Sequence, residues 1–248
     1  MMNTNTNLKY LDDTYADTDE GLVLRVGRDN RGSYIVLDQT IFYPQGGGQP
    51  SDTGIIQSEQ IVMNVSFVGF SDGEVLHYIA EEPPGFDALV GQPCELRVDK
   101  SRRLNHAKLH TGGHLIAGII DAQRGPMRAV KGFHFSEGPY VEFEGKPEGE
   151  AESFLATLQA QIDLFIDEDP QVIASMVTYD ELKQRCWSIP SYLPQDKPLR
   201  VVTIWQLDSV PCGGTHVASL AELETLSLVK IKSKKGNSKI SYRVGDAG

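Results

Sequence analysis

Residues 33–57, SYIVLDQTIFYPQGGGQPSDTGIIQ, contain the pattern on which the fold prediction depends. Two runs rich in β-branched and aromatic residues flank a stretch of glycine and proline, which is typical of strands separated by a turn. Similar short runs occupy 21–26, 61–70 and 74–79. Short strands spaced this closely along the chain favour a small antiparallel β-barrel.

A different pattern follows, and we place a boundary between two domains, 1–96 and 97–248. Apolar residues recur with helical spacing over 101–123 and again over 149–169. Further runs predict strands and a short helix, at 131–145, 170–179, 180–185, 199–207 and 226–245. Two longer helices with several non-alternating strands predict an α+β domain. The expected fold class is therefore α+β, with a small barrel preceding a larger layered domain.

The composition narrows the class of protein. The 248 residues carry a net charge of −11, which argues against binding of nucleic acid through the overall field. Two local basic stretches, 99–108 and 230–243, are open to two interpretations, a solvated face or a nucleic-acid contact. The three cysteines do not suggest a disulfide framework. With no predicted membrane span or signal peptide, we expect a cytoplasmic protein with no membrane or DNA partner, of undetermined oligomeric state.

Three histidines stand four residues apart on the first predicted helix: His106, His110 and His114. Each step of four residues turns by roughly 40°, so only an adjacent pair can bind one ion well. Two glycines inside a helix cost about 1 kcal/mol each relative to alanine, so Gly112 and Gly113 indicate that something bulky approaches the helix. They favour the pair His110 and His114. The plain alternative is a set of hydrogen-bonded structural histidines.

A second candidate pair, Cys212 and His216, lies in VPCGGTH, residues 210–216. Together with His110 and His114 it supplies one thiolate and three imidazoles. That set suits tetrahedral Zn²⁺ and suits magnesium or calcium poorly, because those ions prefer oxygen ligands. The sequence therefore predicts a zinc site with these four ligands.

A third unusual stretch is FYPQGGGQPSDTG, residues 42–54. Its consecutive glycines are compatible with a mobile turn or with backbone that approaches a ligand closely. The GK[ST] ending of a phosphate-binding loop is missing.

Three motifs in this order, FYPQGGGQPSDTG, HTGGH and CGGTH, resemble the freestanding alanyl-tRNA editing proteins of the AlaX type and the editing region of alanyl-tRNA synthetases. The resemblance runs through nearly the whole chain. The last two motifs also resemble the editing domain of threonyl-tRNA synthetases, but that domain lacks the glycine-rich segment. The resemblance implies a small barrel joined to an α+β editing domain, and a zinc ion on His110, His114, Cys212 and His216. It also places Gly47, Gly48 and Gln49 near the editing pocket.

The activity that this resemblance implies is hydrolysis of the ester joining serine or glycine to tRNA specific for alanine. A pocket built for alanine discriminates poorly against these two, since one methyl group is worth only about 1–3 kcal/mol. Polar groups able to recognise a serine hydroxyl are Gln49, Thr111 and Thr215, and the backbone N–H groups of Gly213 and Gly214 are candidates for stabilising an oxyanion.

The partner expected from the resemblance is mischarged tRNA. The first candidates for contacting it are Arg102, Arg103 and Lys131, and the second are Lys234 and Lys235. Two other functions stay open. Four zinc ligands are typical of a structural site, which would suit a non-catalytic module that binds tRNA or a synthetase. The net charge of −11 disfavours tRNA binding, so a hydrolase of another small aminoacyl ester stays an alternative.

Overall fold

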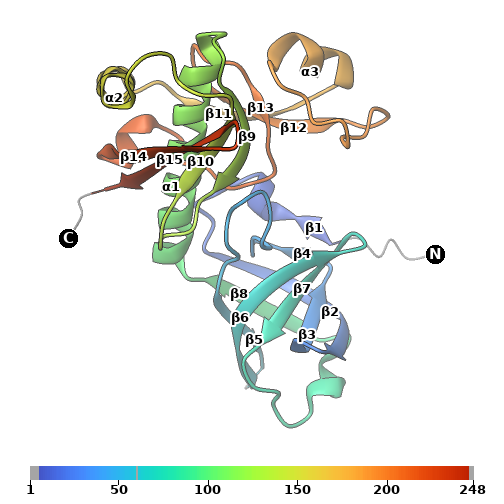
Figure 1. Ribbon diagram of the computed structural model, residues 1–248. Helices are drawn as coiled ribbons and strands as arrows, with labels where there is room; N and C mark the ends of the chain where they lie inside the picture. Colours follow the sequence, from blue (N-terminus) through green and yellow to red (C-terminus); the bar gives the residue numbers. More distant parts are fainter. Residues whose placement is uncertain (1–5, 60, 246–248) are drawn as a thin grey trace. The chain divides into compact units, whose positions relative to one another are not determined.

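The computed structural model describes residues 6–59 and 61–245 and is drawn in Figure 1. The chain divides into two compact units, Met1–Asn105 and His106–Gly248. The predicted α+β class is confirmed, because a closed antiparallel barrel is accompanied by further antiparallel sheets and by helices. The domain ranges 1–96 and 97–248 stay a prediction, and residue 96 lies inside a strand of the first unit.

In the described part of the first unit, six strands close the barrel in the order β2-β3-β7-β6-β5-β8, with every neighbouring pair antiparallel. The barrel strands are β2 (Thr18–Asp29), β3 (Gly32–Leu37), β5 (Gly54–Ser58), β6 (Ile61–Ser71), β7 (Glu74–Ile79) and β8 (Pro93–Val98). The short elements beside them are β1 (Asn7–Leu8), η1 (Lys9–Leu11), β4 (Gln39–Thr40) and η2 (Phe86–Leu89).

The closing strand β8 was not predicted from the sequence. It alternates buried Cys94, Leu96 and Val98 with exposed residues, and it pairs with both β2 and β5. Its short apolar run follows a loop rich in proline and glycine, so the local signal is weak. Pairing on both sides supplies the stability that the local sequence does not.

The glycine-rich segment forms an ordered turn. Gly47 and Gly48 have φ angles of 55° and 81°, and the backbones of Gly46 and Gln49 exchange hydrogen bonds of 3.2 and 2.8 Å across them. A two-residue turn with positive φ at both positions is the type that favours glycine. The Tyr43 hydroxyl donates to the Gly46 carbonyl oxygen at 2.8 Å and fixes the turn further. The glycine run is therefore needed for this turn, whatever else it does.

Asp52, at the end of the same segment, holds a buried ion pair with Arg103. Arg103 Nε donates to both carboxylate oxygens, at 3.1 and 3.0 Å, while Arg103 Nη1 donates to the Thr14 carbonyl oxygen at 3.1 Å. Arg103 Nη2 donates to the Ile41 carbonyl oxygen and to Asp52. The Tyr43 backbone N–H donates to Asp52 Oδ2 at 2.7 Å.

Arg103 is only 1% exposed. Its guanidinium donates to groups inside the protein, so the burial of Arg103 argues against its predicted contact with tRNA.

Over residues 106–245, the second unit contains the predicted helices and two further sheets. Its elements are α1 (Lys100–Ala122, which begins in the first unit), β9 (Arg128–Phe133), β10 (Tyr140–Glu144), α2 (Ala151–Glu168), β11 (Val172–Val177), α3 (Tyr179–Arg185), β12 (Leu199–Ile204), β13 (Val210–Pro211), η3 (Leu220–Leu223), β14 (Leu226–Lys234) and β15 (Asn237–Val244). The strand order is β14-β15-β10-β9 in one sheet and β11-β12-β13 in the other. Helix α3 begins with a capping box between Thr178 and Glu181, a signal visible in the sequence.

The main core of this unit lies between α1, α2 and the sheet β14-β15-β10-β9 (Figure 1). Apolar residues from the helical stripes of α1 and α2 meet the inward-facing residues of the strands, among them Ile116, Leu158, Phe143 and Ile240. This packing fixes α1 against the sheet, and α1 carries two of the predicted metal ligands.

Candidate functional site

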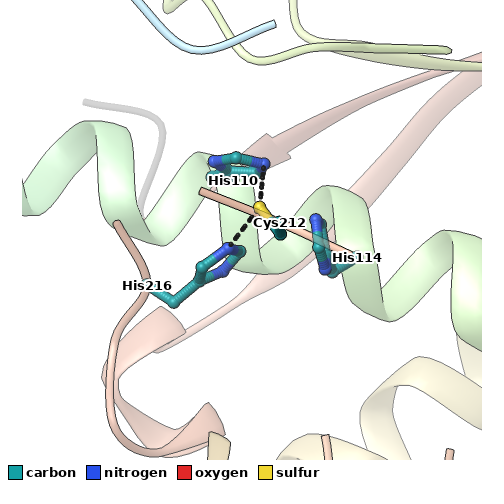
Figure 2. Close-up of side chains that lie close together, drawn as sticks. All are labelled: His110, His114, Cys212 and His216. Carbon is teal, nitrogen blue, oxygen red and sulfur yellow. Dashed lines mark hydrogen bonds between the residues drawn. The ribbon is translucent and has the colours of Figure 1, made fainter. Parts of the chain in front are cut away.

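Four side chains from two distant segments converge in the second unit. His110 and His114 project from one side of α1 toward Cys212 and His216, which follow β13 (Figure 2). One donor atom from each residue lies within 4.8 Å of the others. We call these residues the histidine–cysteine cluster. His106, one turn earlier on α1, is not part of it.

Two donor–donor distances in the cluster match those expected around a tetrahedrally coordinated ion. Cys212 Sγ lies 3.6 Å from His110 Nε2 and 3.3 Å from His216 Nε2. With Zn–S and Zn–N bonds of about 2.3 and 2.0–2.1 Å, two ligands at a tetrahedral angle are about 3.5 Å apart. The three imidazole rings approach one another with centroid distances of 4.4 to 4.9 Å. Soft sulfur and imidazole nitrogen at this spacing fit Zn²⁺.

Burial sets the charge of these groups. It lowers the pKa of His114 to about 4, and it lowers the pKa values of His110 and His216 well below the usual value of 6.5. Neutral imidazoles with available lone pairs are the form that binds a metal. Burial raises the pKa of the Cys212 thiol, against the opposing effects of the Gly214 N–H and Arg200. Metal binding would therefore displace a proton from Cys212.

Thr111 orients His216. Its Oγ1 lies 3.1 Å from His216 Nδ1 and accepts the Val217 N–H at 3.2 Å. With Nε2 directed at the cluster, Nδ1 carries the proton and donates to Thr111, the usual arrangement behind a metal-ligating histidine. Thr111 is completely buried. These contacts give it a positioning role in place of the substrate contact expected from the sequence.

The loop that carries Cys212 is held by two further contacts. The Gly214 N–H donates to Cys212 Sγ at 3.3 Å. Arg200 Nη1 donates to the carbonyl oxygens of Cys212 and Gly214, at 2.8 and 3.0 Å. Because the Gly214 N–H is directed at the sulfur, we no longer count it as an oxyanion donor. Gly213 is exposed, and a Cβ there would meet nothing within 4 Å, so this side of the loop is open.

The helix glycines have a different role from the expected one. A Cβ at Gly113 would lie 2.3 Å from the ring of His134, and a Cβ at Gly112 would lie 2.9 Å from Leu226. The bulky groups that approach α1 are therefore the protein's own side chains from the sheet. Glycine here permits close packing of helix on sheet and is not evidence of an open substrate site.

His134 and Tyr242 are parts of the site that the sequence analysis missed. The Tyr242 hydroxyl donates to the Leu109 carbonyl oxygen at 2.8 Å, so it accepts the Nδ1 proton of His134 at 2.7 Å. The His134 ring then stacks on His110 at 4.5 Å, with 24° between the planes. The alternation of KGFHF was a usable signal, because it places His134 on the face opposite to Phe133 and Phe135.

The remaining predicted residues are not members of the histidine–cysteine cluster. Gly47, Gly48 and Gln49 belong to the first unit, and the Gln49 side chain is buried. Arg102 is half-buried and its Nε donates to the Ser51 carbonyl oxygen at 3.1 Å. Thr215 is buried beside the cluster residue His216, and Lys131 is exposed on β9.

Residues 9–102 match the protein family described as tRNA synthetases class II (A). The alanyl-tRNA editing protein AlaX-M of Methanosarcina barkeri is 27% identical over 97% of this chain and 100% of its own length. The resemblance to alanyl-tRNA editing proteins is confirmed. AlaX-L of Pyrococcus horikoshii is 26% identical over 92% of this chain and 55% of that protein. The alanine–tRNA ligase of Haloquadratum walsbyi is 29% identical over 98% of this chain, which spans 26% of the ligase.

None of the helices in residues 6–59 and 61–245 has the length and apolar character required to cross a membrane.

Proposed function

We propose that this protein is a cytoplasmic hydrolase that removes serine or glycine wrongly attached to tRNA specific for alanine. The scissile bond is the ester between the amino acid and the terminal ribose. The observation that carries the proposal is the convergence of His110, His114, Cys212 and His216, in a chain similar over its length to proteins named for alanyl-tRNA editing. We propose these four residues as the ligands of Zn²⁺.

A zinc ion bound here would supply a Lewis acid able to polarise a carbonyl or to lower the pKa of water. The chain's own residues hold the ligands in place: Thr111 fixes the His216 ring, and the Gly214 N–H and Arg200 fix the loop of Cys212. The exposed backbone of Gly213 is the candidate oxyanion donor. Thr215, Gln49, Gly47 and Gly48 stay candidates for contacting the amino acid and the ribose, the last three on the resemblance alone.

A second function is favoured by the number of donors. Four protein ligands are typical of structural zinc, whereas catalytic zinc usually has three and an open position. A module that binds charged tRNA without hydrolysing it would have such a site. The open side of the loop at Gly213 favours the hydrolase.

The test is deacylation of tRNA specific for alanine that carries labelled serine, glycine or alanine. We expect wild-type protein to release serine or glycine and to spare alanine. His110→Ala should slow release by more than about 100-fold, since changes behind the ligands alone cost 10–100-fold. The matched control is His106→Gln, four residues earlier on the same helix and outside the cluster, which should retain activity.

Three results would contradict the hydrolase. Stoichiometric zinc with tRNA binding and no release would identify the non-catalytic module. Turnover of small aminoacyl esters without any effect of tRNA would identify a hydrolase of another substrate. Equal activity of His110→Ala and wild type, with both proteins folded by circular dichroism, would remove the cluster from the reaction.

A further inference from the structure

The sheet β14-β15-β10-β9 has two faces of opposite character. Its inner face packs on α1 and α2 through residues such as Val141, Phe143 and Ile240. The register of the strands puts the alternate residues on the other face, which we call the outer sheet face. Among the described residues, its exposed cations are Arg128, Lys131, Lys230, Lys232, Lys234, Lys239 and Arg243, and the carboxylates on the same face are Glu142 and Glu144.

The strand register arranges these cations in rows across the sheet. Lys232 pairs with Lys239, Lys239 with Glu142, and Glu142 with Lys131, so one row crosses all four strands. Glu142 is held by Asn237 at 3.0 Å and by Lys239 at 3.4 Å. The face is therefore strongly basic although the chain as a whole carries a net charge of −11.

Three aromatic side chains lie on this face beside the cations. Phe133 stacks on Phe135 at 4.4 Å with 14° between the planes, and on Tyr140 at 5.2 Å with 17°. Lys239 Nζ lies 4.3 Å from the centre of the Tyr140 ring. None of the three belongs to the hydrophobic cores formed by residues 6–59 and 61–245. Packing of a core therefore does not account for them.

Protection of a sheet edge explains only part of this pattern. Lysines on an edge strand discourage pairing with other chains, and β14 is an edge strand. Lys239 and Arg243 are on β15, which is paired on both sides. Edge protection also gives no reason for a row of parallel aromatic rings.

We infer that the outer sheet face binds RNA, and that its occupant is the tRNA whose ester the proposed function hydrolyses. The inference rests on that function for the identity of the RNA. Cations spaced across a sheet match a phosphate backbone, whose neutralisation releases counterions. Flat aromatic side chains next to them match unpaired bases, which bind proteins by stacking. An acidic protein surface would use the cations but not the flat rings.

The experiment measures binding of uncharged tRNA specific for alanine, by fluorescence anisotropy at several KCl concentrations. Lys232→Gln/Lys239→Gln should weaken binding about tenfold at low salt and reduce the salt slope by about 1–2, roughly one for each lysine that no longer neutralises a phosphate. The matched control is Lys183→Gln/Lys197→Gln, which removes the same charge from exposed positions outside this sheet. We expect its salt slope to equal that of wild type.

A second variant tests stacking separately from charge. Tyr140→Leu keeps apolar bulk and removes the flat ring, so tRNA affinity should fall about fivefold or more. Its affinity for heparin, a polyanion without bases, should not change. Circular dichroism and thermal unfolding verify that each variant is folded. Equal salt slopes in the sheet and control variants, or equal losses of tRNA and heparin binding in Tyr140→Leu, would overturn the inference.

Because the probe carries no amino acid, the two proposals fail separately. Sheet-dependent binding without any deacylation would contradict the proposed hydrolase and support this surface. Deacylation by a protein whose tRNA binding is unaffected by the sheet variants would support the proposed hydrolase and contradict RNA binding by the outer sheet face.

Discussion

Each unit of this protein buries a group of polar side chains, and the two groups are built in different ways. In the first unit, Arg103 and Asp52 are opposite charges, and each is also bonded to backbone groups of the barrel. In the second unit, the four members of the histidine–cysteine cluster direct the same kind of atom, a lone-pair donor, at one another.

The difference separates a structural network from a binding site. Each member of a buried ion pair relies on the opposite charge of its partner, so removing one partner leaves an uncompensated buried charge and is strongly destabilising. Four lone-pair donors that converge on one point can share a single cation, so binding of a metal ion among them contributes free energy to the folded state. The first group should therefore control stability, and the second should control metal binding.

The largest effect is expected from Asp52→Asn. This change keeps the shape of the side chain and leaves the buried Arg103 without a counter-charge, which costs about 3–5 kcal/mol of unfolding free energy. Urea unfolding at neutral pH measures it. Asp87→Asn, at an exposed carboxylate of the same unit that pairs with Arg28, is the control and should cost much less. Similar losses in both variants, or loss of zinc from folded Asp52→Asn, would erase the contrast between the two groups.

The next largest effect is expected from zinc binding, which should increase the unfolding free energy. At a free zinc concentration about one hundred times its Kd, binding should raise the unfolding free energy of the wild type by about 2.7 kcal/mol over the chelator-treated protein. Cys212→Ala should lose this response while its metal-free stability stays close to that of the wild type. Cys186→Ala is the control, because Cys186 is a buried cysteine of another core in the same unit. An unchanged zinc response in Cys212→Ala would exclude the thiolate as a ligand.

The sequence predicted what local pattern encodes. Runs rich in β-branched and aromatic residues predicted β2, β3, β5, β6 and β7, and helical spacing predicted α1 and α2. The strand pair at the C-terminal end was also expected. Helical spacing predicted that only an adjacent pair of histidines could bind one ion, but it did not choose between the two pairs. Gly112 and Gly113 selected His110 and His114 over His106, although the fold gives these glycines another role. β8 was missed because its stability comes from pairing with strands on both sides.

Contacts between distant segments could not be predicted in this way. The pairs Asp52–Arg103 and Thr111–His216 join residues 51 and 105 positions apart, and no periodicity indicates them. The same limitation explains the helix glycines. Their sequence indicated a close approach to α1, but only the fold shows that His134 makes it.

A smaller effect, on zinc affinity, is expected from changing Thr111, which contacts the proposed ligand His216. Thr111→Val preserves the volume and removes the acceptor of the His216 Nδ1 proton, so zinc affinity should fall about 10–100-fold. Competition with a chromophoric chelator measures this affinity. Thr111→Ser keeps the hydroxyl and should retain most of the affinity. If valine and serine behave alike, Thr111 contributes packing only and does not position His216.

The smallest effect concerns His77, a buried histidine of the first unit. Its Nδ1–H donates to the Ile35 carbonyl oxygen at 3.0 Å, so its Nε2 accepts from the Thr40 hydroxyl at 2.8 Å. Burial lowers its pKa from 6.5 to about 4, with the Ile35 hydrogen bond opposing. The folded protein keeps this ring neutral while the unfolded chain takes up a proton below pH 6.5. Its contribution to stability is therefore complete above pH 6.5 and falls with acid until about pH 4.

Between about pH 7.5 and 5.5 this residue should cost the wild type about 1.4 kcal/mol of unfolding free energy, which is a tenfold change in the unfolding equilibrium constant. Urea unfolding at the two pH values, compared between wild type and His77→Gln with zinc present in both, isolates the contribution of this ring from those of the cluster histidines. The glutamine side chain can make both hydrogen bonds and does not titrate, so the variant should lose less stability in acid. Equal losses would mean that the barrel accommodates a charged His77. In that event, the hydrogen bonds of His77 to Ile35 and Thr40 would not be enough to keep its buried ring neutral. The contrast between His77 and the metal-binding histidines would then be weaker.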